Sequence, residues 1–342
     1  MAAASLRVLR AGMQTTVQAG PRLHDRHFGV ATGGAADYES LQLANLLVGN
    51  AVDAAALEMT LRGDELLWPS GAEVAVVGAD MAPLVRLPDG KKVSLPACRP
   101  VSLPPNSVTQ FSTARRGCRT ILAVAGGLRI AEVLGSTSTL LRSSLGGFHG
   151  RALQDGDELF AAGSPSRASP LKFHAADWGA GHDLLPLISG QVLRIIAGES
   201  LALLSAADRH LFLTAEFRIR SESDRMGARL SGPKLHVPNA GLRRSEPTTP
   251  GTIQLPPDGN PVLLLADSAP TGGYPQVAHV ISADLGLAAQ LPPGGTCRFE
   301  AVSVEAARTV LLARHQRMQR RQIMIQELRV AAAHSAQKDR AD

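Results

Sequence analysis

The chain has 342 residues, of which 44% are hydrophobic and 4% aromatic, with 33 glycines and 22 prolines. This length predicts one large or two ordinary domains, and the many turn-forming residues favour sheets or barrels built from short strands. Most of the formal net charge of +5 lies in residues 305–342, and the nearly neutral remainder gives no support for nucleic-acid binding.

The three cysteines are Cys98, Cys118 and Cys297, which are widely spaced and form no CxxC pair. This pattern favours core packing over a metal site or a disulfide. The N-terminus has no apolar segment of signal-peptide length, and no run of about 18 apolar residues follows. We therefore expect a cytoplasmic protein with no metal and no contact with a membrane.

The chain begins with two short predicted strands, followed by a glycine-rich loop that carries His24 and His27. Pro21 and the glycines oppose a helix here, so the histidines are interpreted as loop residues or ligand contacts, with a metal site as the weaker alternative. Asp37 is then predicted to cap an amphipathic helix that ends at Gly49.

Short strands punctuated by Pro and Gly dominate residues 57–160, and this rhythm predicts a closed or nearly closed barrel. The polar segment 134–157 interrupts them. Its hydroxyls at 136–139 and the guanidiniums of Arg142 and Arg151 either hold an anion or belong to an irregular loop that wraps the barrel.

The second half repeats the strand-rich pattern. We predict an N-terminal domain over 1–162, a linker over 163–190, a second domain over 191–303, and a C-terminal helix with a basic tail over 304–342. The helix is interpreted as a surface helix, with partner or acidic-ligand binding as the weaker alternative.

One polar turn follows an apolar strand that ends at Asp267. Prolines, close-approach glycines and hydroxyl side chains meet there, so the turn either grips a small polar ligand or simply reverses the chain. The turn residues expected to contact substrate are Thr271, Gly272, Gly273 and Tyr274.

A second polar turn lies upstream and contains Ser223, Asp224 and Arg225. Arg225 is expected to hold a substrate carboxylate while Asp224 orients it, and the alternative is a surface pair between these two residues. An amide and two carboxylates elsewhere could hydrogen-bond a small amide substrate. These candidates are Gln254 for substrate binding, and Asp258 and Asp267 for catalysis.

Familiar cofactor motifs are missing from the sequence. There is no GxxxxGK[ST] phosphate loop, no GxGxxG after a strand, no GxSxG or HExxH, and no lysine turn that would carry biotin. An ATP or biotin site would therefore come from another chain, or from a site without a local signature.

Seven separated motifs resemble the biotin-dependent carboxyltransferase family, also called allophanate hydrolase subunit 2, which includes the C subunit of 5-oxoprolinase and KipA. The motifs are QTTVQ (14–18), LANLLVGN (43–50), AVAGG (123–127), LGSTSTLL (134–141), GGFHGRALQDGD (146–157), SDRMGARLSGP (223–233), and GTIQLPPDGNPVLLLAD (251–267) with TGGYP (271–275). The sequence departs from the family in the N-terminal loop, at AGPRLH (19–24) and at 33–35.

The resemblance implies a mainly β protein with two cyclophilin-like β-barrel domains, a few short helices and a C-terminal helix. It implies membership of an ATP-dependent 5-oxoprolinase complex, which opens the lactam of 5-oxoproline to glutamate with a partner of the subunit 1 type, also called the B subunit, and a lactam-hydrolase-like A subunit. ATP would bind with the complex, and biotin, if used, would sit on a partner chain. The alternatives are carboxyl transfer from carboxybiotin to urea or another small amide, and a non-enzymatic KipA-like regulatory partner.

Overall fold

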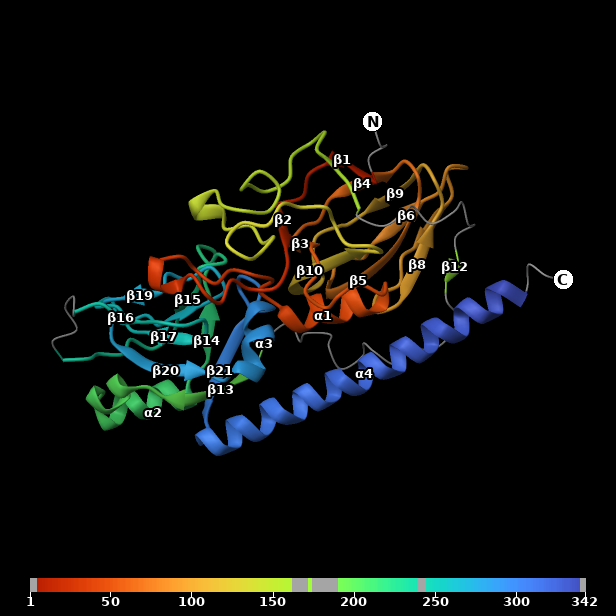
Figure 1. Ribbon diagram of the computed structural model, residues 1–342. Coiled ribbons are helices and arrows are strands. Elements are labelled where there is room, and N and C mark those ends of the chain that lie inside the picture. The colour runs from red at the N-terminus through yellow and green to blue at the C-terminus, as the bar shows by residue number, and fades with distance from the viewer. Residues whose placement is uncertain (1–4, 162–171, 174–189, 239–243, 339–342) are drawn as a thin grey trace.

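The computed structural model describes residues 5–161, 172–173, 190–238 and 244–338. Two β-rich units lie side by side, and one long helix runs along both of them (Figure 1). The chain is mainly β, as the sequence predicted.

The N-terminal unit contains two six-stranded sheets, with strand orders β11-β1-β4-β9-β6-β7 and β12-β8-β5-β10-β3-β2. The strands are β1 (Leu6–Arg10), β2 (Gln14–Gln18), β3 (Ala56–Thr60), β4 (Glu65–Trp68), β5 (Ala72–Asp80), β6 (Leu84–Arg86), β7 (Lys92–Ser94), β8 (Pro100–Leu103), β9 (Ser107–Gln110), β10 (Arg116–Val124), β11 (Glu158–Leu159) and β12 (Lys172–Phe173).

One core fills the space between the two sheets. Leu6, Leu66 and Trp68 from one sheet pack with Val74 and Leu122 from the other, and all five are fully or almost fully buried. Side chains alternate between the faces of a strand, so each sheet turns one apolar face inward. A closed or nearly closed barrel was predicted for this unit, and full closure is wrong, because the described strands form two open sheets.

The C-terminal unit is a closed barrel of seven strands in the order β13-β20-β17-β18-β15-β14-β21, with a separate β16-β19 hairpin. β13 and β21 pair in parallel and the other neighbours pair antiparallel. The predicted barrel is confirmed here. Its strands are β13 (Gln191–Ala197), β14 (Phe217–Ile219), β15 (Gly227–Ser231), β16 (Glu246–Pro247), β17 (Thr252–Gln254), β18 (Val262–Leu264), β19 (Thr271–Gly272), β20 (Gln276–Val280) and β21 (Thr296–Ala301).

The short helices pack against the two β-rich units, with contacts to β5, β10 and β21. α1 begins after Asp37, whose carboxylate accepts a hydrogen bond from the Ser40 backbone N–H at 3.2 Å, so the predicted N-cap is confirmed. The helices are α1 (Tyr38–Leu47), α2 (Ala206–Thr214) and α3 (Leu285–Ala289), with 3₁₀ turns η1 (Arg26–Phe28), η2 (Leu141–Ser143), η4 (Glu199–Leu203) and η5 (Ser282–Asp284).

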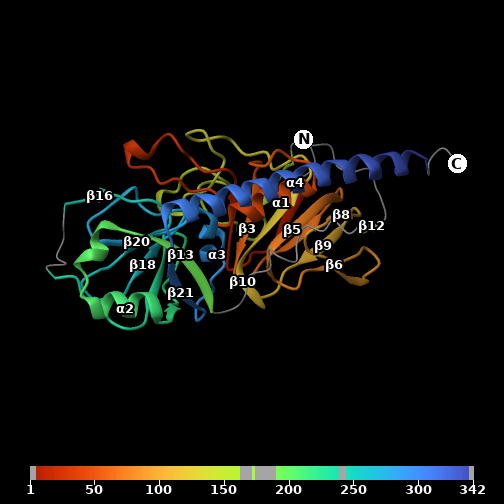
Figure 2. The ribbon, with the colours of Figure 1, turned by 90° about the horizontal axis from the view of Figure 1, so that it is seen from below.

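The long helix α4 (Val304–Lys338) crosses from the barrel to the two-sheet unit (Figure 2). Arg314 and Arg321 both pair with Glu39 of α1, at 2.8 and 3.2 Å, and Arg329 pairs with Glu73 of β5 at 2.7 Å. The predicted helix is confirmed, and part of its basic charge ties it to the protein. The predicted linker, apart from Lys172–Phe173 and Gly190, lies outside the described residues.

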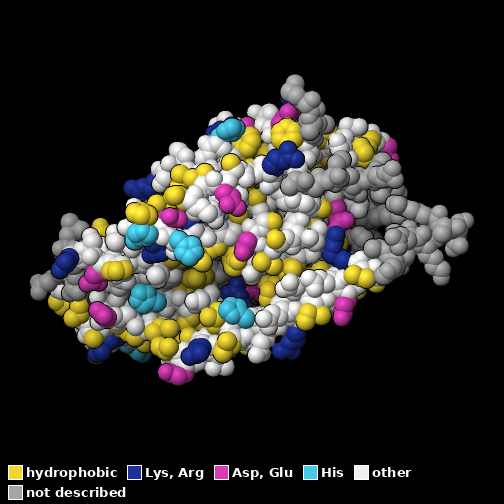
Figure 3. Space-filling view, in the orientation of Figure 1, with side chains coloured by type: hydrophobic (Ala, Val, Ile, Leu, Met, Phe, Trp, Pro, Cys, Tyr) yellow, Lys and Arg dark blue, Asp and Glu magenta, His cyan; other side chains and the backbone are white. Residues whose placement is uncertain are grey.

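No helix in the described part of the chain is long and apolar enough to cross a membrane. On the face shown in Figure 3, basic and acidic side chains are interspersed, and a hollow opens above α4 between the two units.

Candidate functional site

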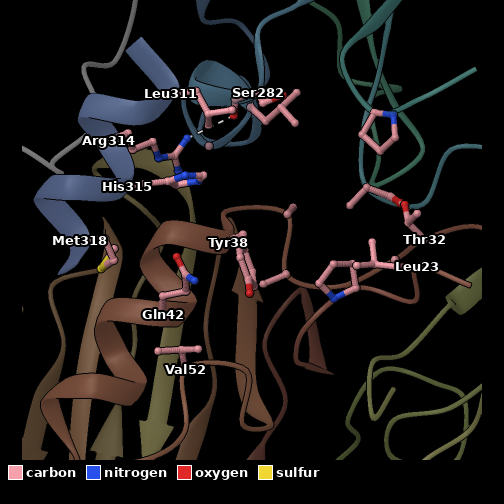
Figure 4. Close-up of a pocket in the computed structure, with 18 of the residues that line it drawn as sticks. Leu23, Thr32, Tyr38, Gln42, Val52, Ser282, Leu311, Arg314, His315 and Met318 are labelled. Atoms are coloured by element: carbon pink, nitrogen blue, oxygen red, sulfur yellow. Dashed lines mark hydrogen bonds between the residues drawn. The ribbon is translucent and has the colours of Figure 1, made fainter. Parts of the chain in front are cut away.

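A cavity of about 640 Å³ lies where the N-terminal loop, α1, the barrel and α4 meet (Figure 4). We call it the apolar cavity. None of the residues predicted to bind substrate or to act in catalysis lines it. Its labelled walls are Leu23, Thr32, Tyr38, Gln42, Val52, Ser282, Leu311, Arg314, His315 and Met318.

Three polar side chains of the apolar cavity, those of Tyr38, Thr32 and Arg314, are engaged with protein atoms. The Tyr38 hydroxyl donates to Asp53, and the Thr32 hydroxyl donates to the Ala266 carbonyl at 3.2 Å. Arg314 pairs with Glu39 and donates to the Ala283 carbonyl at 2.6 Å. Burial and the hydrogen bond to Asp53 raise the pKa of Tyr38, so its phenol is neutral at ordinary pH.

A second opening, which we call the polar cleft, lies on the other side of the turn after β18. A larger part of about 580 Å³ and a smaller part of about 350 Å³ share Arg142, Met226 and Ala269. Predicted site residues gather in it: Gln254, Asp258, Thr271 and Tyr274 line the larger part, and Asp267 lines the smaller part.

Gln254 ends β17 and pairs with Val262 of β18 and Gln276 of β20, which fixes its backbone in the barrel wall. Its side chain is only 6% exposed. A side chain at Gly272 would collide with Gln254 Nε2, so the predicted close-approach glycine lets the neighbouring chain pass beside this amide.

Asp258 lies in the turn after β17 and lines the larger part of the cleft. Its two carboxylate oxygens accept hydrogen bonds from the backbone N–H and the side-chain amide of Asn260, at 3.1 and 2.8 Å. Partial burial opposes ionisation, but these hydrogen bonds prevail and lower the pKa of Asp258. Asp258 is therefore a charged acceptor at neutral pH.

Asp267 follows β18 and is bound by Arg225 through two hydrogen bonds, Nε to Oδ2 at 2.9 Å and Nη2 to Oδ1 at 2.8 Å. Burial and the nearby Glu58 carboxylate raise the pKa of Asp267, and Arg225 opposes that rise. A buried carboxylate held in this way has a fixed orientation at the edge of the cleft.

Arg225 is 3% exposed and lines none of the cavities described here. Besides Asp267, it bonds Glu58 of β3, and its Nη2 donates to the Gly34 carbonyl at 2.6 Å. Burial alone lowers the pKa of Arg225, but the two carboxylates outweigh it and raise that pKa. Arg225 thus joins the two units by a buried ionic cluster.

The expected partnership between Asp224 and Arg225 is corrected. Asp224 Oδ1 accepts backbone hydrogen bonds from Met226 at 2.8 Å and Gly227 at 3.1 Å, so it shapes the turn while Arg225 faces inward. Ser223 Oγ accepts a hydrogen bond from the Arg229 backbone N–H at 3.0 Å and lines a separate pocket of about 150 Å³. Gly273 lines neither part of the polar cleft.

The segment 134–157 divides between the two alternatives left open by the sequence. Ser136 and Thr139 donate their hydroxyls to the Gly20 and Val17 carbonyls at 2.8 and 2.9 Å, as expected for a wrapping loop. Arg151 forms a bidentate pair with Asp157 at 2.7 and 2.8 Å. Arg142 differs, because it lines the polar cleft and forms no ion pair with any described residue.

Within the described ranges, no group of three or more His, Cys, Asp or Glu side chains is placed to hold a metal ion. Sequence reasoning did not single out Glu58. The available signal was an acidic residue within the apolar strand LEMTL at 57–61, which implies a buried partner. That partner, Arg225, is 167 positions away.

Comparison with known proteins gives consistent results. Residues 28–301 match the family model described as "Carboxyltransferase domain, subdomain A and B". The chain is 34% identical over 307 residues to the C subunit of 5-oxoprolinase from Escherichia coli, covering 88% of this chain and 93% of that protein. It is 32% identical over 300 residues to the protein of that name from Haemophilus influenzae, covering 88% and 92%.

A solved structure of the K. lactis urea amidolyase has a TM-score of 0.83 and 26% identity, covering 94% of this chain and 20% of the larger protein. The structural likeness therefore extends over both β units and is not confined to one of them.

Proposed function

The chain belongs to the carboxyltransferase domain family, subdomains A and B, and from this premise we propose that it is one component of an ATP-dependent 5-oxoprolinase complex. The complex would open the lactam of 5-oxoproline to give glutamate. Coverage supports this choice, since the chain spans 93% of the E. coli 5-oxoprolinase C subunit but only 17% of the "Urea amidolyase" of Saccharomyces cerevisiae.

The observation that carries the proposal is the gathering of amide, carboxylate and hydroxyl side chains in the polar cleft. 5-Oxoproline presents a lactam carbonyl, a lactam N–H and a carboxylate. Gln254, Thr271 and Tyr274 supply groups that can hydrogen-bond a lactam, and Asp258 supplies a charged acceptor. A cleft of about 580 Å³ accommodates a molecule of this size.

We assign different roles to the two carboxylates. Asp267 has a raised pKa and a fixed orientation, so it is the better candidate for accepting or returning a proton at the lactam. Asp258, with its lowered pKa, would orient a donor on the substrate or on a partner chain. Arg225 would act as a positioning residue for Asp267 and not as the substrate clamp first expected.

Partner chains are part of this proposal. The sequence has no phosphate-binding glycine loop, so ATP would bind with the assembled complex, and the B-type and A-type subunits would complete the reaction. Carboxyl transfer to urea is the second candidate. Its support is the TM-score of 0.83 with the K. lactis urea amidolyase, and it requires a biotin carrier on another chain.

The test is release of glutamate from 5-oxoproline and ATP by this chain alone, by the partner subunits without it, and by the full mixture. We expect activity only in the full mixture. No glutamate from a mixture that forms one complex by size-exclusion chromatography would contradict the proposal. Carboxylation of urea by this chain with a biotin carrier and biotin carboxylase would instead support the second candidate.

A further inference from the structure

Two buried polar atoms of the polar cleft have no hydrogen-bond partner among the described residues: Gln254 Nε2 and Ser268 Oγ. Their residues are 6% and 1% exposed, and both line the larger part of the cleft. A buried donor or acceptor without a partner destabilises the folded protein, so such atoms are normally satisfied. Of the seven such atoms in the described part of the chain, these two belong to residues that line the polar cleft, and we infer that a ligand in the cleft supplies their partners.

We propose that Gln254 and Ser268 together recognise the amide group of the substrate. Gln254 Nε2 would donate to the amide carbonyl oxygen, and Ser268 Oγ would accept from the amide N–H. This inference rests on the proposed function, because it takes the ligand to be a small amide, and it identifies the atoms that select it.

Arg142 supplies a further contact to the substrate from the N-terminal unit, whereas Gln254 and Ser268 belong to the C-terminal unit. It lines both parts of the cleft, and its described side-chain contact is with Met226 Sδ at 3.1 Å. Arg220, by contrast, pairs with Glu222 at 2.7 Å. A guanidinium without a carboxylate partner at the mouth of an amide-binding cleft selects an amide that also bears an anionic group.

Arg142 is placed differently from Arg220 and Arg229, because it alone of the three lines both the part with Gln254 and Ser268 and the part with Asp267. We therefore assign the substrate carboxylate to Arg142. The substrate class that follows is a small cyclic amide with one carboxylate, placed with its amide against Gln254 and Ser268.

The experiment measures the dissociation constants of 5-oxoproline and of 2-pyrrolidinone, the same lactam without the carboxylate, in the assembled complex without ATP. Arg142→Gln should raise the dissociation constant of 5-oxoproline about tenfold or more and leave that of 2-pyrrolidinone unchanged. Gln254→Met and Ser268→Ala should raise the dissociation constants of both ligands by similar factors. Arg218→Gln is the control, because Arg218 lies on barrel strand β14 outside both parts of the cleft, and it should change neither affinity.

Unchanged affinities in Gln254→Met and Ser268→Ala, with native circular dichroism, would overturn the amide assignment. An equal effect of Arg142→Gln on both lactams would overturn the carboxylate assignment. If the wild-type complex binds neither lactam, the proposed function fails, and urea binding is compared in the same variants. Loss of urea binding in Gln254→Met would then support the amide assignment, and unchanged urea binding would overturn it.

Discussion

The two main openings of this protein differ less in size than in the state of their polar groups. In the apolar cavity, the hydroxyls of Tyr38 and Thr32 and the guanidinium of Arg314 already bond protein atoms. In the polar cleft, Gln254 Nε2 and Ser268 Oγ are buried without a partner among the described residues. The openings thus differ in unsatisfied hydrogen-bonding capacity, and on this ground we place the proposed binding site in the polar cleft and not in the apolar cavity.

One short turn separates the two openings. Leu265 and Ala266 face the apolar cavity, while Asp267 and Ser268 face the polar cleft. The buried cluster of Arg225 with Asp267 and Glu58 holds this turn against the N-terminal unit. The contrast between the openings therefore depends on a buried ion cluster, of which Asp267 lines the polar cleft while Arg225 and Glu58 line neither opening.

The largest expected effect comes from breaking that cluster. Arg225→Met removes the ion-pair partner of the buried Asp267 and leaves Glu58 with only Arg119, 3.8 Å away, and it should lower the free energy of unfolding by about 3–5 kcal/mol. Urea denaturation measures it. Arg220→Met is the control, because Arg220 forms an exposed pair with Glu222 and its loss should change stability little. Equal losses in the two variants would contradict the role given to the cluster.

A pair of glycines sharpens the comparison between the openings. Gly272→Ala would push against Gln254 Nε2 in the cleft, whereas the new methyl in Gly286→Ala would lie 2.9 Å from Asp37 Oδ1, beside the apolar cavity. We expect Gly272→Ala to lower kcat/KM for 5-oxoproline about tenfold, because it moves a substrate contact. Gly286→Ala should lower Tm and leave KM unchanged. A lower kcat/KM in Gly286→Ala and not in Gly272→Ala would contradict the placement of the substrate in the polar cleft.

Two tyrosines provide a milder version of the same test. Tyr38→Phe removes the hydrogen bond to Asp53 beside the apolar cavity and should lower the free energy of unfolding by about 1 kcal/mol, with no change in KM. Tyr274→Phe, in the cleft, should raise KM without a change in stability. Thermal unfolding and steady-state kinetics separate these outcomes, and a higher KM in Tyr38→Phe would argue against the division of roles.

The smallest effect concerns Asp64, a buried carboxyl that lines neither opening. Burial raises the pKa of Asp64, although its hydrogen bonds with Thr15 and Gly12 oppose the rise. Its folded-state pKa thus exceeds the unfolded value of about 3.9, so ionisation destabilises the fold as pH rises through that interval. Wild type and Asp64→Asn should match in urea midpoint at low pH, and the variant should be the more stable at pH 8. A constant difference at all pH values would refute this.

Much of the fold could be predicted because its signals are local. The cap at Asp37, the strands bounded by Pro and Gly, and the helix after Val304 depend on neighbouring residues. Closure of a sheet into a barrel does not depend on neighbouring residues alone. Whether a run of short strands forms one barrel or two packed sheets is decided by pairings between distant strands, so the N-terminal unit was predicted as a barrel and is two sheets.

The sequence predicted several of the residues that line the polar cleft, but it did not predict the directions in which their side chains point. Gln254, Asp258 and Thr271 lie in one cleft because they flank consecutive barrel strands. The inward direction of Arg225 could not be foreseen, because its partner Glu58 belongs to the other unit. The special status of Arg142 likewise emerges only when Arg151 is seen to be paired with Asp157.

The most direct test of the account compares two glutamines in the assembled complex. Gln254→Met removes the unpaired amide of the polar cleft, and Gln42→Met removes an amide of similar size that lines the apolar cavity. We predict that kcat/KM for 5-oxoproline falls about tenfold or more in Gln254→Met and is unchanged in Gln42→Met. A loss confined to Gln42→Met would place the substrate in the apolar cavity and contradict the account.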